Sequence, residues 1–301
     1  KFFRTFNRKS LCCLLMGIII IAIGATVTVA IIYFSNDPNV DSSLAAGLMT
    51  GALTSTAGFS AAKEVARDEA KVTAGYGIAH LFGVLGVVFF VQIVPRILKV
   101  DIEEERERFI AANAIETDYT DVKLTIIDPY GFFPFFLTIV FGSMIGCIEI
   151  PGINFSLGTS GGTLIAGLII GHFSHIGPID CRVKKETLNF FRELGLCLFL
   201  IGVGVPGGVN FISNIRLSYF IYGALITLIP IIIGYFFGKY VFNMNIFNNL
   251  GSITGGITCT PALGALISTS GIEEVSSAYA ATYLVALFCE VLASRIIASI
   301  L

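Results

Sequence analysis

Residues 47–56 read GLMTGALTST, and residues 251–260 read GSITGGITCT. Both stretches follow one ten-residue pattern, G-x-x-T-G-x-x-T-x-T, within strongly apolar surroundings. About twenty residues after each copy comes a tyrosine between small residues, Tyr76 after the first and Tyr279 after the second. A glycine-interrupted, hydroxyl-rich segment that occurs twice at membrane depth is typical of the broken helices that form the solute site of a duplicated transporter.

The composition indicates the class of protein. Apolar residues make up 55% of the chain and charged residues 13%, with a mean hydropathy of +0.84, whereas soluble domains contain about 25% charged residues. The apolar run at residues 11–34 is long enough to cross a bilayer, which takes about 20 helical residues, and too long for the core of a signal peptide. We therefore predict an all-α integral membrane protein that retains this run.

Other classes of site are disfavoured. The net charge of −2 and the absence of a basic stripe argue against a nucleic-acid partner. The seven cysteines lie mostly in apolar runs without the spacing of metal ligands, so we expect free thiols and no bound metal or cofactor. His172 and His175 lack a third ligand nearby in the sequence and are a weak metal signal.

Nine apolar runs follow one another, at residues 11–34, 45–61, 72–95, 131–149, 158–173, 188–206, 217–240, 248–267 and 277–300. The two that hold the repeated pattern are the least hydrophobic. If these two are re-entrant or broken, the positive-inside rule places 14 of the 19 Lys and Arg residues in the cytoplasm; if they cross, the split is 8 inside to 11 outside. The count predicts re-entrant or broken segments.

This topology predicts inverted repeats. The run at residues 11–34 goes outward and its counterpart at residues 217–240 goes inward. We expect about five transmembrane helices in each repeat plus one broken or re-entrant Thr/Gly-rich segment.

The predicted domains follow from the repeats. Residues 1–98 are the C-terminal part of the first membrane repeat, residues 99–129 a polar cytoplasmic linker, and residues 130–301 a complete second repeat. The first repeat is incomplete because nothing precedes it that corresponds to residues 131–206. Either the natural gene lost this part or the chain is a piece of a longer protein, and we expect the latter because the sequence starts at Lys1 without a methionine.

Four motifs carry a resemblance to a known family. They read GTSGGTLIAGLIIG at residues 158–171, RELGLCLFLIGVG at 192–204, GGITCTPAL at 255–263 and AYAATY at 278–283. In this order they resemble the membrane domain of the aspartate:alanine exchanger family of bacterial secondary transporters. The resemblance covers nearly all of the second repeat and, more weakly, residues 44–100. It implies a duplicated permease of the bacterial inner (cytoplasmic) membrane that moves dicarboxylates or acidic and small amino acids, typically by exchange.

The chain departs from the family pattern at a few positions. Leu81 and Leu284 stand where the family tends to have proline, and His80 stands where the second copy has the aromatic Tyr283. The first copy has Ala57 where the second has Pro261. The family's regulatory domains between the repeats are missing from this sequence, so regulation by that route is not expected here.

The candidate binding residues lie in three short segments of the sequence, together with two tyrosines. Backbone groups freed by a break in the membrane must be satisfied by protein or by a water-filled cavity, and together with hydroxyl groups they can replace the hydration shell of a solute. A helix that starts after Gly158 would also direct its positive end toward an anion. The alternative for the small residues is close helix packing, and for the tyrosines ordinary packing. The candidates are Thr54, Ser55, Thr56, Ser160, Gly161, Gly162, Thr258, Cys259, Thr260, Pro261, Tyr76 and Tyr279.

Charged residues at membrane depth are candidates for coupling or gating. Glu290 lies midway along the last apolar run and is a candidate for proton or cation coupling, unless Arg295 partly neutralises it. Arg192 and Glu193 are candidates for an anion contact or an interfacial ion pair. His80 is a candidate pH sensor or a hydrogen-bonded histidine between helices.

We expect an alternating-access exchanger with a small anionic or zwitterionic solute and the lipid bilayer as partners; a homodimer is a further candidate assembly. The alternative is a passive channel or a membrane-embedded enzyme on a similar helical frame. An enzyme is disfavoured because no nucleophile, base or metal set is clustered in the sequence. A channel is disfavoured because two inverted half-sites in one chain fit a carrier better.

Overall fold

The computed structural model describes residues 8–35, 37–38, 40–99, 103–105, 107, 125–148, 158–173, 175–214, 216–272 and 275–300. These residues are almost entirely helical, which confirms the predicted all-α class. They fall into two compact units. Unit 1 comprises Lys1–Thr5 and Glu116–Pro206, and unit 2 comprises Phe6–Ile115 and Gly207–Leu301. The predicted domains, residues 1–98, 99–129 and 130–301, do not coincide with these two units and stay a prediction.

Unit 2 contains two similar sets of helices. The first set is α1 (Arg8–Phe34), α2 (Ser42–Ala52), α3 (Thr56–Lys63) and α4 (Glu69–Ile97). The second is α9 (Leu217–Phe236) with the π-helical turn η2 (Phe237–Val241), α10 (Ile246–Gly256), α11 (Thr260–Ser270) and α12 (Val275–Ile300). In each set a long helix is followed by two short helices and then by another long helix.

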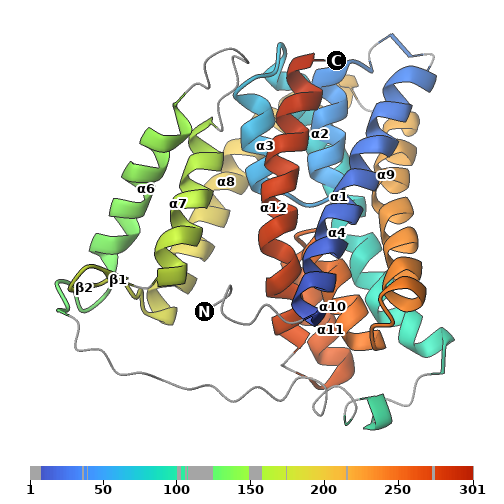
Figure 1. Cartoon of the computed structure of the whole chain (residues 1–301). Coiled ribbons are helices and arrows are strands. Elements are labelled where there is room, and N and C mark those ends of the chain that lie inside the picture. The colour runs from blue at the N-terminus through green and yellow to red at the C-terminus, as the bar shows by residue number, and fades with distance from the viewer. Residues whose placement is uncertain are drawn as a thin grey trace. The chain divides into compact units, whose positions relative to one another are not determined.

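The two short helices of each set form a hairpin. Gly47 of α2 packs on Val72 of α4 and Gly51 packs on Tyr76, so α2 and α4 run parallel. Because α3 lies between them in the chain, it must return toward the end where α2 began. Gly255 of α10 packs on Tyr279 of α12 in the same way. Figure 1 shows the α2–α3 hairpin at the end of unit 2 where the C-terminus lies, and the α10–α11 hairpin at the opposite end.

The two sets interlock and run in opposite directions. Helices α1 and α12 end at one end of unit 2, whereas α4 and α9 end at the other (Figure 1). Helix α1 packs against α10 and α12 of the second set, and α9 packs against α2 and α4 of the first. Neither set can therefore complete its core alone. The number of crossings in each full repeat remains a prediction.

The surface of unit 2 is that of a multi-pass membrane protein. Four described helical segments are long and apolar enough to cross a membrane: Leu11–Phe34, Glu69–Ile97, Leu217–Val241 and Val275–Ser299. On α9 the exposed side chains are large and apolar and recur every three or four residues, which places them on one face of the helix. They are Leu217, Ile221, Leu225, Leu228, Ile232 and Phe236. The opposite face is buried and includes Gly223, Thr227 and Gly234. An apolar outer face, with small and polar residues on the buried face, is suited to a lipid environment.

Unit 1 holds α6 (Phe132–Gly146), α7 (Gly158–Phe173), the short strands β1 (His175–Ile176) and β2 (Ile179–Asp180), and α8 (Lys185–Asn214) as far as Pro206. The strands pair antiparallel. The guanidinium of Arg182, 3.0 Å from the carboxylate, and the backbone N–H of the same residue lower the pKa of the Asp180 carboxyl group. This ion pair fixes the turn that leads into α8.

Candidate functional site

The repeated pattern ends each first hairpin helix with the same backbone geometry. After α2, the N–H of Ser55 donates to the carbonyl of Thr50 and that of Thr54 donates to Gly51. After α10, Cys259 and Thr258 bond to Thr254 and Gly255 in the same way. These are Schellman caps, in which the residue after the C-cap takes the left-handed conformation and is usually glycine.

Threonine occupies this left-handed position in both hairpins. Thr54 has a φ of 56° and Thr258 a φ of 55°. A β-branched residue is strained there, at a cost of roughly 1–2 kcal/mol. A local strain of this kind persists only where the surrounding structure compensates for it.

The compensation comes from the opposite hairpin. The hydroxyl of Thr54 donates to the carbonyl of Ile257 at 2.8 Å, and the hydroxyl of Thr258 donates to the carbonyl of Leu53 at 3.1 Å. The two tips therefore hold each other through a reciprocal pair of buried hydrogen bonds. Glycine at either position would relieve the strain but remove the bond. Thr54 and Thr258, two of the predicted solute-binding residues, therefore use their hydroxyl groups to hold the hairpins together.

The glycines of the pattern have a different role. A Cβ atom on Gly47 would lie 2.2 Å from the carbonyl oxygen of Val72, and one on Gly51 would lie 2.4 Å from that of Tyr76. A Cβ on Gly255 would lie 2.4 Å from the carbonyl oxygen of Tyr279. These glycines let the backbones of neighbouring helices touch, as small residues commonly do between membrane helices.

The second hairpin helices begin at the tips with exposed hydroxyl groups. Ser55 caps α3, its Oγ accepting from the N–H of Gly58 at 3.0 Å, and Ser55 is buried. Cys259 precedes α11, makes no side-chain cap bond and is also buried. By contrast, Thr56 at the start of α3 is exposed, as are Thr260 and Pro261 at the start of α11. The free amides and positive ends of both helices point to the tips, where an anion is stabilised.

The two tyrosines differ in their surroundings. Tyr279 is half-buried, and its hydroxyl lies 3.1 Å from that of Thr260. Tyr76 is buried, with its ring centroid 4.5 Å from that of Phe59 and 4.9 Å from that of His80. The structure therefore brings Tyr279 to the exposed tip of its hairpin and packs Tyr76 in the core. The Nδ1 atom of His80 is buried without a hydrogen-bond partner among the described residues.

Glu290 is buried on α12, and its exposed fraction is 0%. Arg295 bonds to Glu64, at the end of α3, with 2.5 Å between the guanidinium and carboxylate. Arg295, which the sequence suggested as a neutralising partner of Glu290, therefore forms an ion pair with Glu64.

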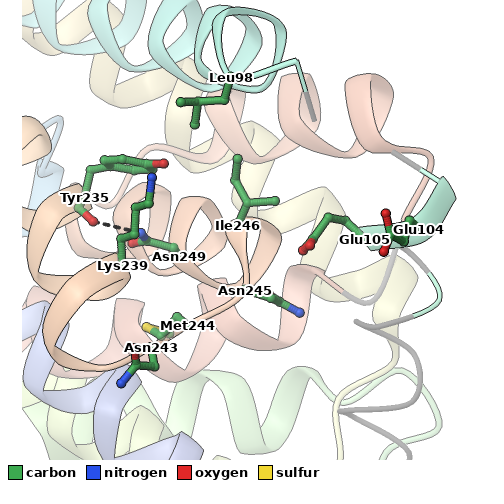
Figure 2. A pocket seen from close by; sticks show the side chains of 10 residues that line it. All are labelled: Leu98, Glu104, Glu105, Tyr235, Lys239, Asn243, Met244, Asn245, Ile246 and Asn249. Atoms are coloured by element: carbon green, nitrogen blue, oxygen red, sulfur yellow. Dashed lines mark hydrogen bonds between the residues drawn. The ribbon is translucent and has the colours of Figure 1, made fainter. Parts of the chain in front are cut away.

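A polar cavity lies at the end of unit 2 where α10 begins, and Figure 2 shows its lining side chains. Its volume is about 490 Å³. The Nζ of Lys239 lies over the rings of Tyr235 and Tyr240, and the amide of Asn249 donates to the carbonyl of Tyr235 at 2.9 Å. Asn245 caps α10 through a bond to the N–H of Asn248. Sequence reasoning missed this cavity, although three asparagines opening an apolar segment were a signal.

The candidates in unit 1 lie on two helices, α7 and α8. Ser160 and Gly161 fall in the first turn of α7, where the structure describes the backbone but not their side chains. Gly162 packs on α6, since a Cβ there would lie 2.1 Å from the carbonyl oxygen of Gly142. Arg192 and Glu193 form an exposed ion pair at 2.7 Å.

Comparison with known proteins identifies relatives of this chain among membrane transporters. A family model described as a predicted permease membrane region matches residues 1–96 and 134–299. An uncharacterized transporter of Bacteroides fragilis is 37% identical over 175 residues, covering 56% of this chain and 33% of that protein. An uncharacterized transporter of Desulfotalea psychrophila is 32% identical over 182 residues, covering 58% of this chain and 34% of that protein. The chain thus spans about a third of the length of the curated relatives it matches. No solved structure matches the chain.

Proposed function

Because the chain belongs to the aspartate:alanine exchanger family, whose membrane region the matching family model describes, we propose that it forms part of a secondary transporter. The transporter exchanges anionic or small amino acids or dicarboxylates by alternating access. It lies in the cytoplasmic membrane of a bacterium.

The observation that carries the proposal is the meeting of two hairpins from opposite ends of unit 2. Their tips are locked by the bonds from Thr54 and Thr258 and present exposed hydroxyls at Thr56 and Thr260. Broken helices that meet near the middle of the bilayer are the usual solute site of secondary transporters. In this proposal unit 2 is the block that carries the solute, and unit 1 is the scaffold.

The chemistry of the tips favours a carboxylate. The helices α3 and α11 both start there, so their free amides and dipoles attract negative charge. The cavity beside α10 adds Lys239 at one end of unit 2, and Glu104 and Glu105 also line it. Charges of both signs suit an amino acid, which carries both an ammonium group and a carboxylate.

Counterflow in proteoliposomes tests exchange. The complete protein is reconstituted, the vesicles are loaded with aspartate, alanine or succinate, and labelled aspartate is offered outside. Exchange predicts that at least one loaded solute accelerates uptake of the label, whereas a channel lets the label equilibrate without a solute on the other side. Absence of acceleration with every loaded solute contradicts the proposal.

Thr260→Val tests the tip as the binding surface. Valine keeps the shape but removes a hydroxyl that faces the proposed solute, so we expect the KM for exchange to rise roughly tenfold, which corresponds to about 1.4 kcal/mol. The matched control is Thr269→Val on the same helix, because that hydroxyl donates to the carbonyl of Ala265 in its own helix. An equal rise in both variants, or in neither, would return Thr260 to a packing role.

A further inference from the structure

The carboxyl group of Glu290 is buried in the core of unit 2 without a hydrogen-bond partner among the described residues. The side chain is fully buried, and neither carboxylate oxygen makes a hydrogen bond within the described part of the chain. An isolated carboxylate in such a place is very costly, and the group avoids the cost by taking up a proton or a cation.

The carboxyl group lies beside the tip of the first hairpin. A Cβ atom on Gly58, in the first turn of α3, would lie 3.2 Å from Cγ of Glu290 and 3.1 Å from Oγ of Ser55. The Ser55 hydroxyl is close enough to affect the carboxyl group but lies outside hydrogen-bond geometry. Glu290 is thus placed where a movement of the hairpin changes its surroundings.

The second hairpin lacks this arrangement. Counting from the matched tyrosines Tyr76 and Tyr279, the position equivalent to Glu290 is Val87, which is fully buried. Counting from Thr54 and Thr258, Ser55 corresponds to Cys259 and Gly58 corresponds to Ala262. Two polar residues and one glycine at the tip of the first hairpin therefore correspond to three apolar residues at the tip of the second.

This difference between the two hairpins indicates that the carboxyl group of Glu290 is not needed for packing. The same fold accepts valine at the equivalent position, so packing does not require a carboxyl group there. Gly58 leaves room for the longer side chain of Glu290, whereas Ala262, the corresponding residue of the second hairpin, carries a Cβ atom. The three differences act together to accommodate one buried carboxyl group at one hairpin tip.

We propose that Glu290 is a proton-coupling site, which binds a proton while the first hairpin tip is closed against it and releases the proton when the tip moves. The inference rests on the proposed transport function and names the ion coupled to it. A proton needs one carboxylate oxygen, whereas a metal cation needs several oxygen ligands. Thr50, which also borders this spot, turns its methyl group toward it, with Cγ2 3.1 Å from the Cβ position of Gly58.

Other ionisable groups near Glu290 define the controls. Tyr76 of α4 and Tyr283 of α12 lie within electrostatic range of the carboxyl group, and His80 stacks on Tyr76. Helices α2, α10 and α11 bring no charged or titratable side chain. The remaining ionisable residues on α1, α3 and α12 are Arg8, Lys9, Cys12, Cys13, Tyr33, Lys63, the Glu64–Arg295 pair, Tyr279 and Cys289.

The decisive variant is Glu290→Gln in the complete protein in proteoliposomes. Aspartate, alanine and succinate are added in turn, and proton movement is followed with a pH dye. We expect proton movement with the transported solute in the wild type and its loss in Glu290→Gln. Counterflow should persist in the variant, because an amide resembles the protonated carboxyl group and exchange needs no net proton transfer.

Three outcomes would overturn the inference. Net uptake of the transported solute by the wild type without proton movement would remove the coupling. Solute uptake that depends on a sodium gradient and not on the pH gradient would show that the coupled ion is not a proton. Proton movement that survives Glu290→Gln but is lost in His80→Gln assigns it to the imidazole. Glu69→Gln is the matched control, since this carboxylate is exposed at the start of α4 and bonds to Lys63.

A second measurement does not depend on transport. Infrared difference spectra of the purified protein during a pH titration should show a protonated carboxylic acid band that disappears at high pH. The band should be absent from Glu290→Gln and present in Glu69→Gln. The band without any counterflow would contradict the proposed exchange but retain the proton site. Counterflow without the band would contradict the proton site but retain the exchange.

Discussion

At the residue scale, each position of the ten-residue pattern has its own physical task. The two glycines allow backbone contact between helices, and the first threonine is buried with its hydroxyl bonded to its own helix. The second threonine takes a left-handed turn and braces the other hairpin. The third is exposed at the start of the returning helix. The pattern therefore combines packing, chain reversal and a polar surface in ten residues.

Replacing a packing glycine should destabilise unit 2. In Gly51→Ala the new methyl group would lie 2.4 Å from the carbonyl oxygen of Tyr76, so α2 and α4 must separate. We expect a loss of about 1–3 kcal/mol, the usual range for overpacking, seen as a lower Tm in detergent. The matched control is Gly77→Ala, because nothing lies within 4 Å of its Cβ position. A Tm for Gly51→Ala equal to that of the control would show that the helices are not in close contact.

At the element scale, the short hairpin helices depend on their surroundings. Helices of 8 or 11 residues are marginal in isolation. Here α2 is buried along its whole length, its N-terminus is capped by Asp41, and the hydroxyl of Thr227 on α9 donates to the carbonyl of Ala52 near its end. Caps and cross-helix bonds replace the hydrogen bonds that a broken helix loses.

Capping also makes the start of α6 sensitive to pH. Asp128 accepts bonds from the N–H groups of Tyr130 at 2.8 Å and Phe133 at 3.0 Å, which lowers the pKa of its carboxyl group. The cap is present above the unfolded pKa of about 3.9 and is lost as the pH falls through the lower folded value. We expect protection of these two amides from hydrogen exchange, relative to their intrinsic rates, to fall below about pH 4.

Two variants check the capping. Asp128→Asn can still accept a bond but does not titrate, so protection should become independent of pH. Asp128→Ala should lose protection at every pH. If protection in the wild type stays constant at acid pH while Asp128→Ala loses it, the charge on Asp128 contributes nothing to the cap.

At the scale of the whole molecule, the positive-inside rule predicts one orientation of the chain in the membrane. Five Lys and Arg residues were predicted to lie outside, and four of these form ion pairs among the described residues. The pairs are Lys63–Glu69, Lys71–Asp41, Arg216–Asp37 and Arg295–Glu64. The positive-inside rule counts Lys and Arg and gives little weight to their acidic partners, so these pairs leave the predicted orientation unchanged.

Thiol labelling from each side of the membrane tests this orientation. In the complete protein with its native cysteines replaced, Arg67→Cys should react with an impermeant reagent from outside the cell and Asn243→Cys only from the cytoplasm. Both positions are exposed and lie at opposite ends of unit 2. The reverse pattern would invert the topology, and labelling of both from the same side would contradict the opposed hairpins.

The sequence by itself determined the membrane class, the positions of the helices and the location of the two breaks. These features depend on local properties: the length of an apolar run, and glycine and threonine where a helix must bend. Tertiary structure decided which side chains meet. Thr54 reaches Ile257 across 203 residues, Thr258 reaches Leu53 across 205, and Arg295 reaches Glu64 across 231. No local pattern encodes such contacts, because they arise only when two oppositely directed sets of helices pack into one core.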